Sequence, residues 1–147
     1  MLEKIFDRQP DIICCTLYLW NIERTLHLLR RVRQNFPRVK IITGGPEVTY
    51  QHPFLFRTGI PDVAVVGEGE RVLPEILAAL QKGTQTNFSQ VAWKTGRRYS
   101  WGNLSAPSLT LHEGLPPAHH SSWKPDPHGM AYLETGRGCP LRCSYCR

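Results

Sequence analysis

Three cysteines near the carboxyl end of the sequence are the residues whose type and spacing could do chemistry. Cys139, Cys143 and Cys146 are spaced C-x3-C-x2-C, directly after the stretch Glu134-Thr-Gly-Arg-Gly138. Thiolates this close together suit a metal ion or an iron–sulfur cluster better than a disulfide, because soft sulfur ligands bind soft metals. The glycine before the first cysteine lets the backbone turn tightly around such a group.

Two other metal sites fit this spacing less well. Structural zinc takes four tetrahedral ligands, usually as two C-x2-C pairs, so Cys14, Cys15 or a histidine elsewhere would have to supply the fourth. Ferredoxin-type clusters use C-x2-C-x2-C and a more distant fourth cysteine, and neither is present. Three cysteines leave one iron of a four-iron cluster open to a substrate group.

The composition and the absence of a signal segment predict a globular, cytoplasmic protein. The sequence has 147 residues, enough for one domain or for a small domain and part of a second. It has no long apolar run and no secretory signal, so we expect a reducing compartment and no membrane partner. The net charge is +6, but its densest basic group, Arg30, Arg31 and Arg33, is expected on the solvated face of a helix. A nucleic-acid partner is therefore not expected.

Apolar strands and amphipathic helices alternate along the first half of the sequence. Buried strands are predicted at residues 11–17, 39–43 and 63–66, and helices at residues 2–6, 22–36 and 72–80. Asn21 is the predicted N-cap of the second helix, Pro74 is placed in the first turn of the third, and Gly83 is placed at its C-terminus. Residues 47–58 fit either a helix or a loop.

This alternation is typical of an α/β fold with a parallel sheet, here a partial doubly wound, Rossmann-like sheet. Because the sequence opens on a helix, we expect the first strand–helix unit of such a fold to be absent. Ligands of these sheets bind beyond the C-terminal ends of the strands. The corresponding loops are residues 16–21, 44–47 and 67–70.

The second half has a different organisation. A small hairpin turning at Thr95-Gly96 is followed by a proline-rich connector, and residues 130–134 are strand-like up to the cysteine loop. We therefore predict an α/β domain at residues 1–83, a hairpin and linker at 84–129, and the start of another domain at 130–147.

The stretch Gly-Arg-Gly-Cys-Pro-Leu-Arg-Cys-Ser-Tyr-Cys at residues 136–146 resembles the cluster loop of radical S-adenosylmethionine enzymes. The resemblance implies that Cys139, Cys143 and Cys146 bind three irons of a 4Fe–4S cluster. The fourth iron would chelate S-adenosylmethionine, which the reduced cluster cleaves to a 5′-deoxyadenosyl radical. Tyr145 would pack beside the cluster and the adenine, and residues 130–134 would be the first strand of the barrel.

Residues 1–80 resemble the cobalamin-binding domain that precedes the barrel in one branch of these enzymes. The similar pieces are Tyr-Leu-Trp-Asn at 18–21, Ile-Thr-Gly-Gly-Pro-Glu at 42–47 and Val-Gly-Glu-Gly-Glu at 66–70. The resemblance implies a set of cofactor-binding residues: Thr16, Gly44, Gly45, Pro46, Glu47, Gly67, Glu68, Gly69 and Glu70. The three glutamates also fit plain roles as loop caps or helix-dipole partners.

Cobalamin itself is less strongly indicated than the domain family. The Asp-x-His-x-x-Gly stretch, whose histidine ligates cobalt in some family members, has no match. The histidines outside helices are expected to be solvated: His52, His112, His119, His120 and His128. His27 is expected on a helix surface, and Cys14 and Cys15 are expected in a buried strand, where free cysteine acts as a small hydrophobe.

Together these patterns predict the N-terminal part of a radical S-adenosylmethionine enzyme with a cobalamin-binding-type domain, ending just after the cluster motif. The expected cofactors are a 4Fe–4S cluster, S-adenosylmethionine and cobalamin, with ferredoxin or flavodoxin as electron donor; the substrate stays open. A complete (β/α) barrel needs about 250 residues, so these residues alone are expected to be inactive. Two alternatives stay open: a tRNA methylthiotransferase-like radical enzyme and a non-catalytic zinc- or corrinoid-binding module.

Overall fold

The computed structural model describes residues 2–50 and 52–103. All of them belong to the first of the two units into which the chain divides, residues 1–110. Several predicted features lie outside the described residues: the proline-rich linker with its four histidines, the barrel strand, the three cluster cysteines and Tyr145. No helix in the described part is long and apolar enough to cross a membrane.

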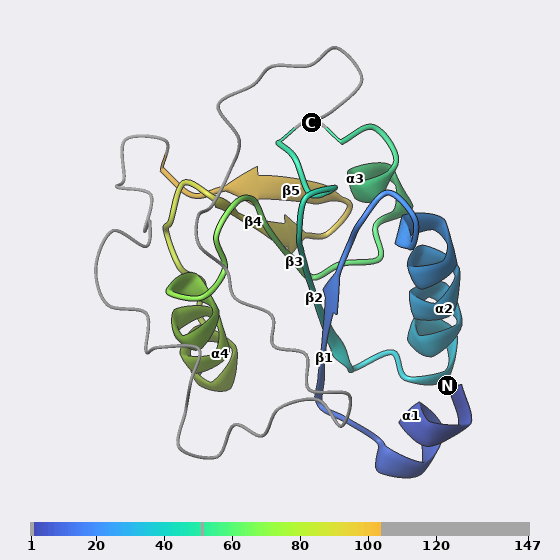
Figure 1. Ribbon diagram of the computed structural model, residues 1–147. Helices are drawn as coiled ribbons and strands as arrows, with labels where there is room; N and C mark the ends of the chain where they lie inside the picture. Colours follow the sequence, from blue (N-terminus) through green and yellow to red (C-terminus); the bar gives the residue numbers. More distant parts are fainter. Residues whose placement is uncertain (1, 51, 104–147) are drawn as a thin grey trace, which may run out of the picture. The chain divides into compact units, whose positions relative to one another are not determined.

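The described elements form one five-stranded sheet with helices on both faces (Figure 1). In chain order they are α1 (Leu2–Arg8), β1 (Ile12–Thr16), α2 (Ile22–Asn35), β2 (Lys40–Gly44), α3 (Leu55–Thr58), β3 (Val63–Val65), α4 (Val72–Lys82), β4 (Val91–Thr95) and β5 (Arg98–Trp101). The sheet order is β1-β2-β3-β4-β5. The first three strands are parallel, and β4 and β5 add to β3 as an antiparallel hairpin. The predicted α/β fold is confirmed, and the hairpin continues its sheet.

Two hydrophobic clusters fill the space between the sheet and its helices. Ile41 faces α2 and packs in the cluster that contains Leu29, whereas its neighbour Ile42 packs in the cluster that contains Ile76 of α4. This follows from strand geometry, because successive side chains point to opposite faces. A strand that is covered on both faces buries successive residues, which explains why Ile41, Ile42 and Thr43 are all buried in β2.

The predicted helix ends are largely confirmed. Pro74 is the third residue of α4, where its missing N–H removes no helical hydrogen bond, and Gly83 closes that helix with a φ of 68°. Asn21 immediately precedes α2 as predicted, but its side chain makes no capping hydrogen bond. Its amide serves the preceding loop instead.

The prediction that β1 is a buried strand is wrong for the described part of the chain. Cys14 is exposed and Cys15 is only half-buried. The physical reason is position: among the described residues β1 pairs with β2 on one side only. An apolar composition indicates an interior strand, but it does not say how many neighbours that strand has.

The prediction of a solvated Arg33 is also wrong. Its guanidinium is half-buried and forms an ion pair with Asp62, with 2.5 Å between Nη2 and Oδ2. Nη1 also donates to the carbonyl oxygen of Val39 at 2.6 Å. Asp62 in turn accepts a hydrogen bond from the backbone N–H of Ile41 at 2.8 Å. Arg33 therefore joins α2 to the segments that lead into β2 and β3.

Candidate ligand-binding edge of the sheet

The loops after β1 and β2 are bonded directly to each other. The backbone N–H of Leu17 donates to the carbonyl oxygen of Gly44 at 2.7 Å, and the N–H of Glu47 donates to the carbonyl oxygen of Leu17 at 3.1 Å. Because the strands are parallel, both loops lie at the same edge of the sheet (Figure 1). The structure therefore brings Thr16 and the Gly-Gly-Pro-Glu segment together.

Gly45 is required by the contact between these two loops. Its φ is 100°, in the region that side chains disfavour, and an added Cβ would lie 2.8 Å from the carbonyl oxygen of Leu17 and 2.9 Å from its nitrogen. The same Cβ would lie 2.7 Å from Cγ2 of Thr16. Close approach of one loop to the other thus accounts for this glycine. Gly44, by contrast, has only ordinary contacts, the nearest at 3.8 Å.

The first loop, residues 17–21, is held by Asn21 and presents apolar side chains to solvent. Oδ1 of Asn21 accepts from the N–H of Tyr18 at 2.8 Å, and Nδ2 donates to the carbonyl oxygen of Thr16 at 3.2 Å. The rings of Tyr18 and Trp20 stack, with centroids 4.5 Å apart and planes 10° apart. Leu19 and Trp20 are 78% and 79% exposed. Such exposure is unusual for large hydrophobic residues on an ordered loop and indicates a binding surface.

His52 lies beside Glu47, the last residue of the second loop. This imidazole is buried; its Nδ1 accepts from the N–H of Leu55 at 3.1 Å, and its Nε2 lies 3.9 Å from Oε2 of Glu47. The prediction of a solvated His52 is therefore wrong. Because Nδ1 is used as an acceptor, a neutral His52 carries its proton on Nε2, the nitrogen that faces Glu47.

The third loop, residues 67–70 after β3, is held by a residue that the sequence patterns did not single out. Nε2 of Gln90 donates to the carbonyl oxygen of Glu68 at 2.8 Å, and the carbonyl oxygen of Gln90 accepts from the N–H of Val66 at 2.9 Å. Gln90 is 2% exposed. An added Cβ at Gly67 or Gly69 would meet nothing within 4 Å, so both glycines border open space. No local signal marks Gln90, since its partner lies 22 positions away.

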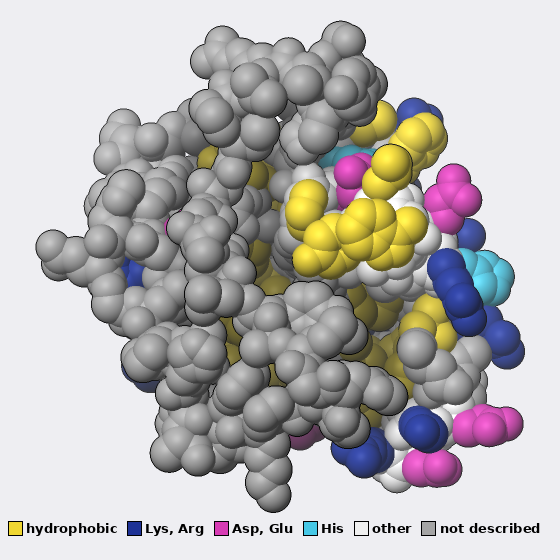
Figure 2. All heavy atoms as spheres, in the orientation of Figure 1, with side chains coloured by type: hydrophobic (Ala, Val, Ile, Leu, Met, Phe, Trp, Pro, Cys, Tyr) yellow, Lys and Arg dark blue, Asp and Glu magenta, His cyan; other side chains and the backbone are white. Residues whose placement is uncertain are grey.

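The exposed large hydrophobic residues of the described part are Leu19 and Trp20, on the loop after β1, and Tyr50 and Phe54, in the segment between β2 and α3. Figure 2 shows hydrophobic side chains gathered at the surface of the described part of this face. Among residues 2–50 and 52–103, no group of three or more His, Cys, Asp or Glu side chains could hold a metal ion.

The fold and this edge define a class of protein: an α/β domain with a ligand-binding edge made of strand-end loops. The sequence profile of the B12 binding domain matches residues 1–77, more than half of the chain. The chain belongs to this family.

The chain is also similar in sequence to three proteins whose names state a methylation reaction. The chain is 28% identical to a 2-(S-pantetheinyl)-carbapenam-3-carboxylate methyltransferase of Streptantibioticus cattleyicolor, over 93% of this chain and 22% of that protein. It is 26% identical to the cobalamin-dependent radical SAM methyltransferase TokK of Streptomyces tokunonensis, over 94% of this chain and 22% of that protein. It is 28% identical to a hopanoid C-3 methylase of Methylococcus capsulatus, over 99% of this chain and 29% of that protein. The chain thus spans less than a third of the length of these three relatives.

Proposed function

We propose that the edge formed by the three loops binds a corrinoid, and that the chain acts within a cobalamin-dependent radical S-adenosylmethionine methyltransferase. The observation that carries the first part is the edge itself. Its loops are fixed by Asn21, by Gly45 and by Gln90, yet it exposes Leu19 and Trp20 to solvent. A preformed loop surface with an exposed apolar part is what a large planar cofactor requires.

The residues at this edge fit a corrinoid. The exposed side chains of Leu19 and Trp20 offer apolar surface for the macrocycle, and the open backbone at Gly67 and Gly69 offers room for its polar side groups. A bound corrinoid supplies a cobalt centre that can carry and release a one-carbon group. His27 is exposed on α2 and His52 is buried against Glu47. We therefore propose that the cobalt is held without an imidazole ligand from residues 2–50 and 52–103.

The second part of the proposal rests on the cysteine spacing and on the names of the relatives. Cys139, Cys143 and Cys146 would hold a 4Fe–4S cluster whose open iron binds S-adenosylmethionine, with Tyr145 beside it. A cytoplasmic ferredoxin or flavodoxin would supply the electron. Methyl transfer is the reaction named for TokK, and we extend the reaction class, without its substrate, to the protein that contains this chain.

Corrinoid binding can be measured with the 147-residue chain. Titration with hydroxocobalamin under anaerobic conditions, followed by gel filtration with detection at visible wavelengths, should give co-elution at about one corrinoid per chain. Trp20→Ala should weaken binding by about tenfold while leaving the thermal midpoint unchanged, because the side chain is 79% exposed. A folded wild-type chain that does not co-elute with corrinoid would refute the proposal.

The cluster needs a separate measurement. After anaerobic reconstitution with iron and sulfide, the chain should hold about four irons, and Cys143→Ser should lose most of them. Zinc bound at one per chain, with no iron taken up, would instead favour a structural zinc module.

A further inference from the structure

The positive charge of the chain is concentrated in one segment, formed by α2 and the residues that follow it. Residues 22–40 hold six of the 18 Lys and Arg residues but one of the 12 Asp and Glu residues, so they account for five of the six net positive charges. Figure 2 shows Lys and Arg side chains (dark blue) beside a histidine (cyan) on the side where Figure 1 places α2. The remainder of the chain is nearly neutral.

The exposed face of α2 carries three arginines, Arg24, Arg30 and Arg31, which we call the arginine face. Arg24 and Arg31 are seven positions apart, so their Cα atoms lie about 10 Å apart along the same side of the helix, with the exposed His27 between them. No carboxylate in the part of the chain that the structure describes forms an ion pair with any of the three arginines.

The stability of the helix does not account for the arginine face. Glu23 is the one acidic residue of α2, and the residues three and four positions after it are Leu26 and His27, so no arginine has an acidic neighbour at the spacing that allows pairing along a helix. Arg24 lies in the first turn, where the helix dipole disfavours positive charge. The arginine face is thus a region of unbalanced charge, which an acidic partner would neutralise.

The residue types favour a protein as this partner over a membrane or a nucleic acid. The apolar residues of α2 are buried or half-buried, with Leu26, Leu29 and Val32 in the core, so the face has no apolar side chain to insert into a lipid surface. It has no Phe, Tyr or Trp side chain on which bases could stack. Guanidinium groups pair with carboxylates through two parallel hydrogen bonds, and arginine, unlike lysine, is enriched at protein interfaces.

The arginine face adjoins the proposed corrinoid edge. The carbonyl oxygen of Tyr18 accepts from the N–H groups of Asn21 and Ile22, both at 3.0 Å, so the first turn of α2 continues directly from the loop that exposes Trp20. A protein bound at Arg24 would therefore lie beside a corrinoid bound at that loop.

We propose that the arginine face is the docking surface for an acidic electron-transfer protein of the flavodoxin or ferredoxin class. The inference rests on the proposed function, which requires an external electron donor. Proteins of this class carry many carboxylates on their surface, which complement the arginines. Electron-transfer complexes are small, weak and guided by opposite charges, so a short row of arginines is sufficient to form one.

Calorimetric titration of the full chain with oxidised flavodoxin, and separately with oxidised ferredoxin, tests the docking surface. One or both should bind at one per chain in about 20 mM salt, and at least tenfold more weakly in about 200 mM salt, because screening weakens exposed charge pairs. Arg24→Gln/Arg31→Gln should weaken binding by about tenfold or more at low salt. The thermal midpoint should not change, because both side chains are exposed.

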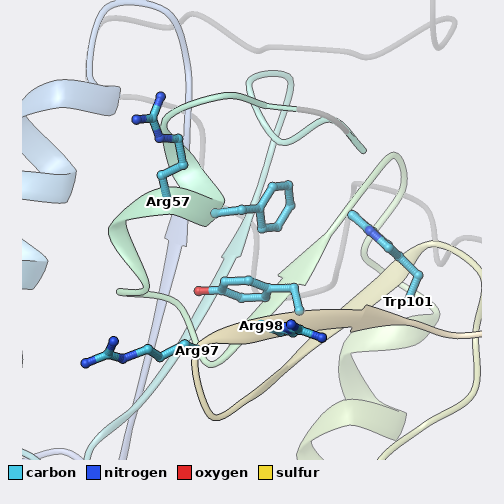
Figure 3. Close-up of a pocket in the computed structure, with 6 residues that line it drawn as sticks. Arg57, Arg97, Arg98 and Trp101 are labelled. Carbon is cyan, nitrogen blue, oxygen red and sulfur yellow. The ribbon is translucent and has the colours of Figure 1, made fainter.

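The matched control is Arg97→Gln/Arg98→Gln, which removes the same charge from the β4–β5 hairpin. Both side chains are exposed, and Figure 3 shows them pointing in different directions, so they form no shared face. This variant should bind the electron-transfer protein within about twofold of the wild type. Equal weakening in the two variants would mean that net charge alone drives the association, and would overturn the proposal.

Absence of saturable binding of both proteins at about 100 μM and low salt would also overturn the proposal. So would tighter binding of a short DNA duplex or of phosphatidylglycerol vesicles that is lost in the Arg24/Arg31 variant, because the arginine face would then serve that partner. Corrinoid binding is measured independently. A chain that binds corrinoid but neither electron-transfer protein would refute the docking surface alone. A chain that binds no corrinoid, yet loses its binding of flavodoxin or ferredoxin in the Arg24/Arg31 variant, would support the docking surface and refute the corrinoid edge.

Discussion

Nε2 of the buried His52 lies 3.9 Å from Oε2 of Glu47, so the glutamate of the Gly-Gly-Pro-Glu segment is supported by a residue from the next segment of the chain. The distance is too long for a hydrogen bond, but the low exposure of both side chains makes the electrostatic contact stronger than it would be in water. Glu47 of the second loop is thus hydrogen-bonded to Leu17 through its backbone, and its side chain lies beside the imidazole of His52.

Replacing His52 should destabilise the domain. His52→Ala removes the acceptor of the Leu55 N–H and leaves a void, so the free energy of unfolding should fall by about 1–3 kcal/mol in urea denaturation. His27→Ala is the matched control, because that side chain is exposed on α2 and its loss should change stability by less than about 0.5 kcal/mol. Equal effects of the two substitutions would contradict the buried role of His52.

Gly45 and Gly67 form a second matched pair, because both have positive φ values, 100° and 75°, but different surroundings. Gly67→Ala meets open space, so only backbone strain of about 1–2 kcal/mol is expected. Gly45→Ala also forces a Cβ against the backbone of Leu17, so its cost should exceed about 2 kcal/mol and corrinoid binding should be lost. Urea denaturation of both variants gives the comparison. If Gly67→Ala proved the more damaging, the contact between the first two loops would not be the reason for Gly45.

The fold could be predicted from the sequence because its signals are local. Apolar runs, helical periodicity, Pro74 and Gly83 each act within a few positions, and the structure follows them. Asn21 shows the limit of local rules, since the same amide chemistry serves an N-cap or a loop clamp, and only the structure distinguishes them.

The supports of the candidate site could not be predicted because they depend on long-range contacts. Gln90, which holds the third loop, bonds to Glu68 across 22 positions. The same limit applies to the fold, where Arg33 pairs with Asp62 across 29 positions at the opposite edge of the sheet. The residues next to Gln90 or Arg33 in the sequence do not indicate its hydrogen-bond partner. The exposure of Cys14 is of the same kind, because it depends on which strands pair with β1.

Replacing Gln90 should weaken corrinoid binding, although Gln90 is 22 positions from its partner Glu68 in the third loop. Gln90→Ala removes the hydrogen bond to the carbonyl oxygen of Glu68, so residues 67–70 should exchange their amide hydrogens faster. Corrinoid affinity should fall by about threefold to tenfold, as expected for one lost hydrogen bond. Gln34→Ala, on the exposed face of α2, is the control and should change neither quantity. Unchanged exchange in the Gln90 variant would show that the third loop is held by other contacts.

Cys15 should make stability depend on alkaline pH. Burial, with a smaller contribution from Cys14, raises the pKa of its thiol from 9.0 to about 11. Below pH 9 the thiol is protonated in both the folded and the unfolded chain, so its contribution to stability is fully present there. Between pH 9 and 11 the unfolded chain loses the proton first, and the free energy of unfolding should therefore fall as the pH rises.

Cys15→Ala isolates this effect from the other ionising groups, including Tyr99, whose pKa is also raised, chiefly by burial. Urea denaturation at pH 8, 9, 10 and 11 should give a shallower fall for the variant than for the wild type. Alkylation by iodoacetamide at pH 8, mapped by mass spectrometry, should modify Cys14 before Cys15, because Cys14 is exposed. Parallel pH curves for wild type and variant would mean that the Cys15 thiol ionises alike in the folded and unfolded chain.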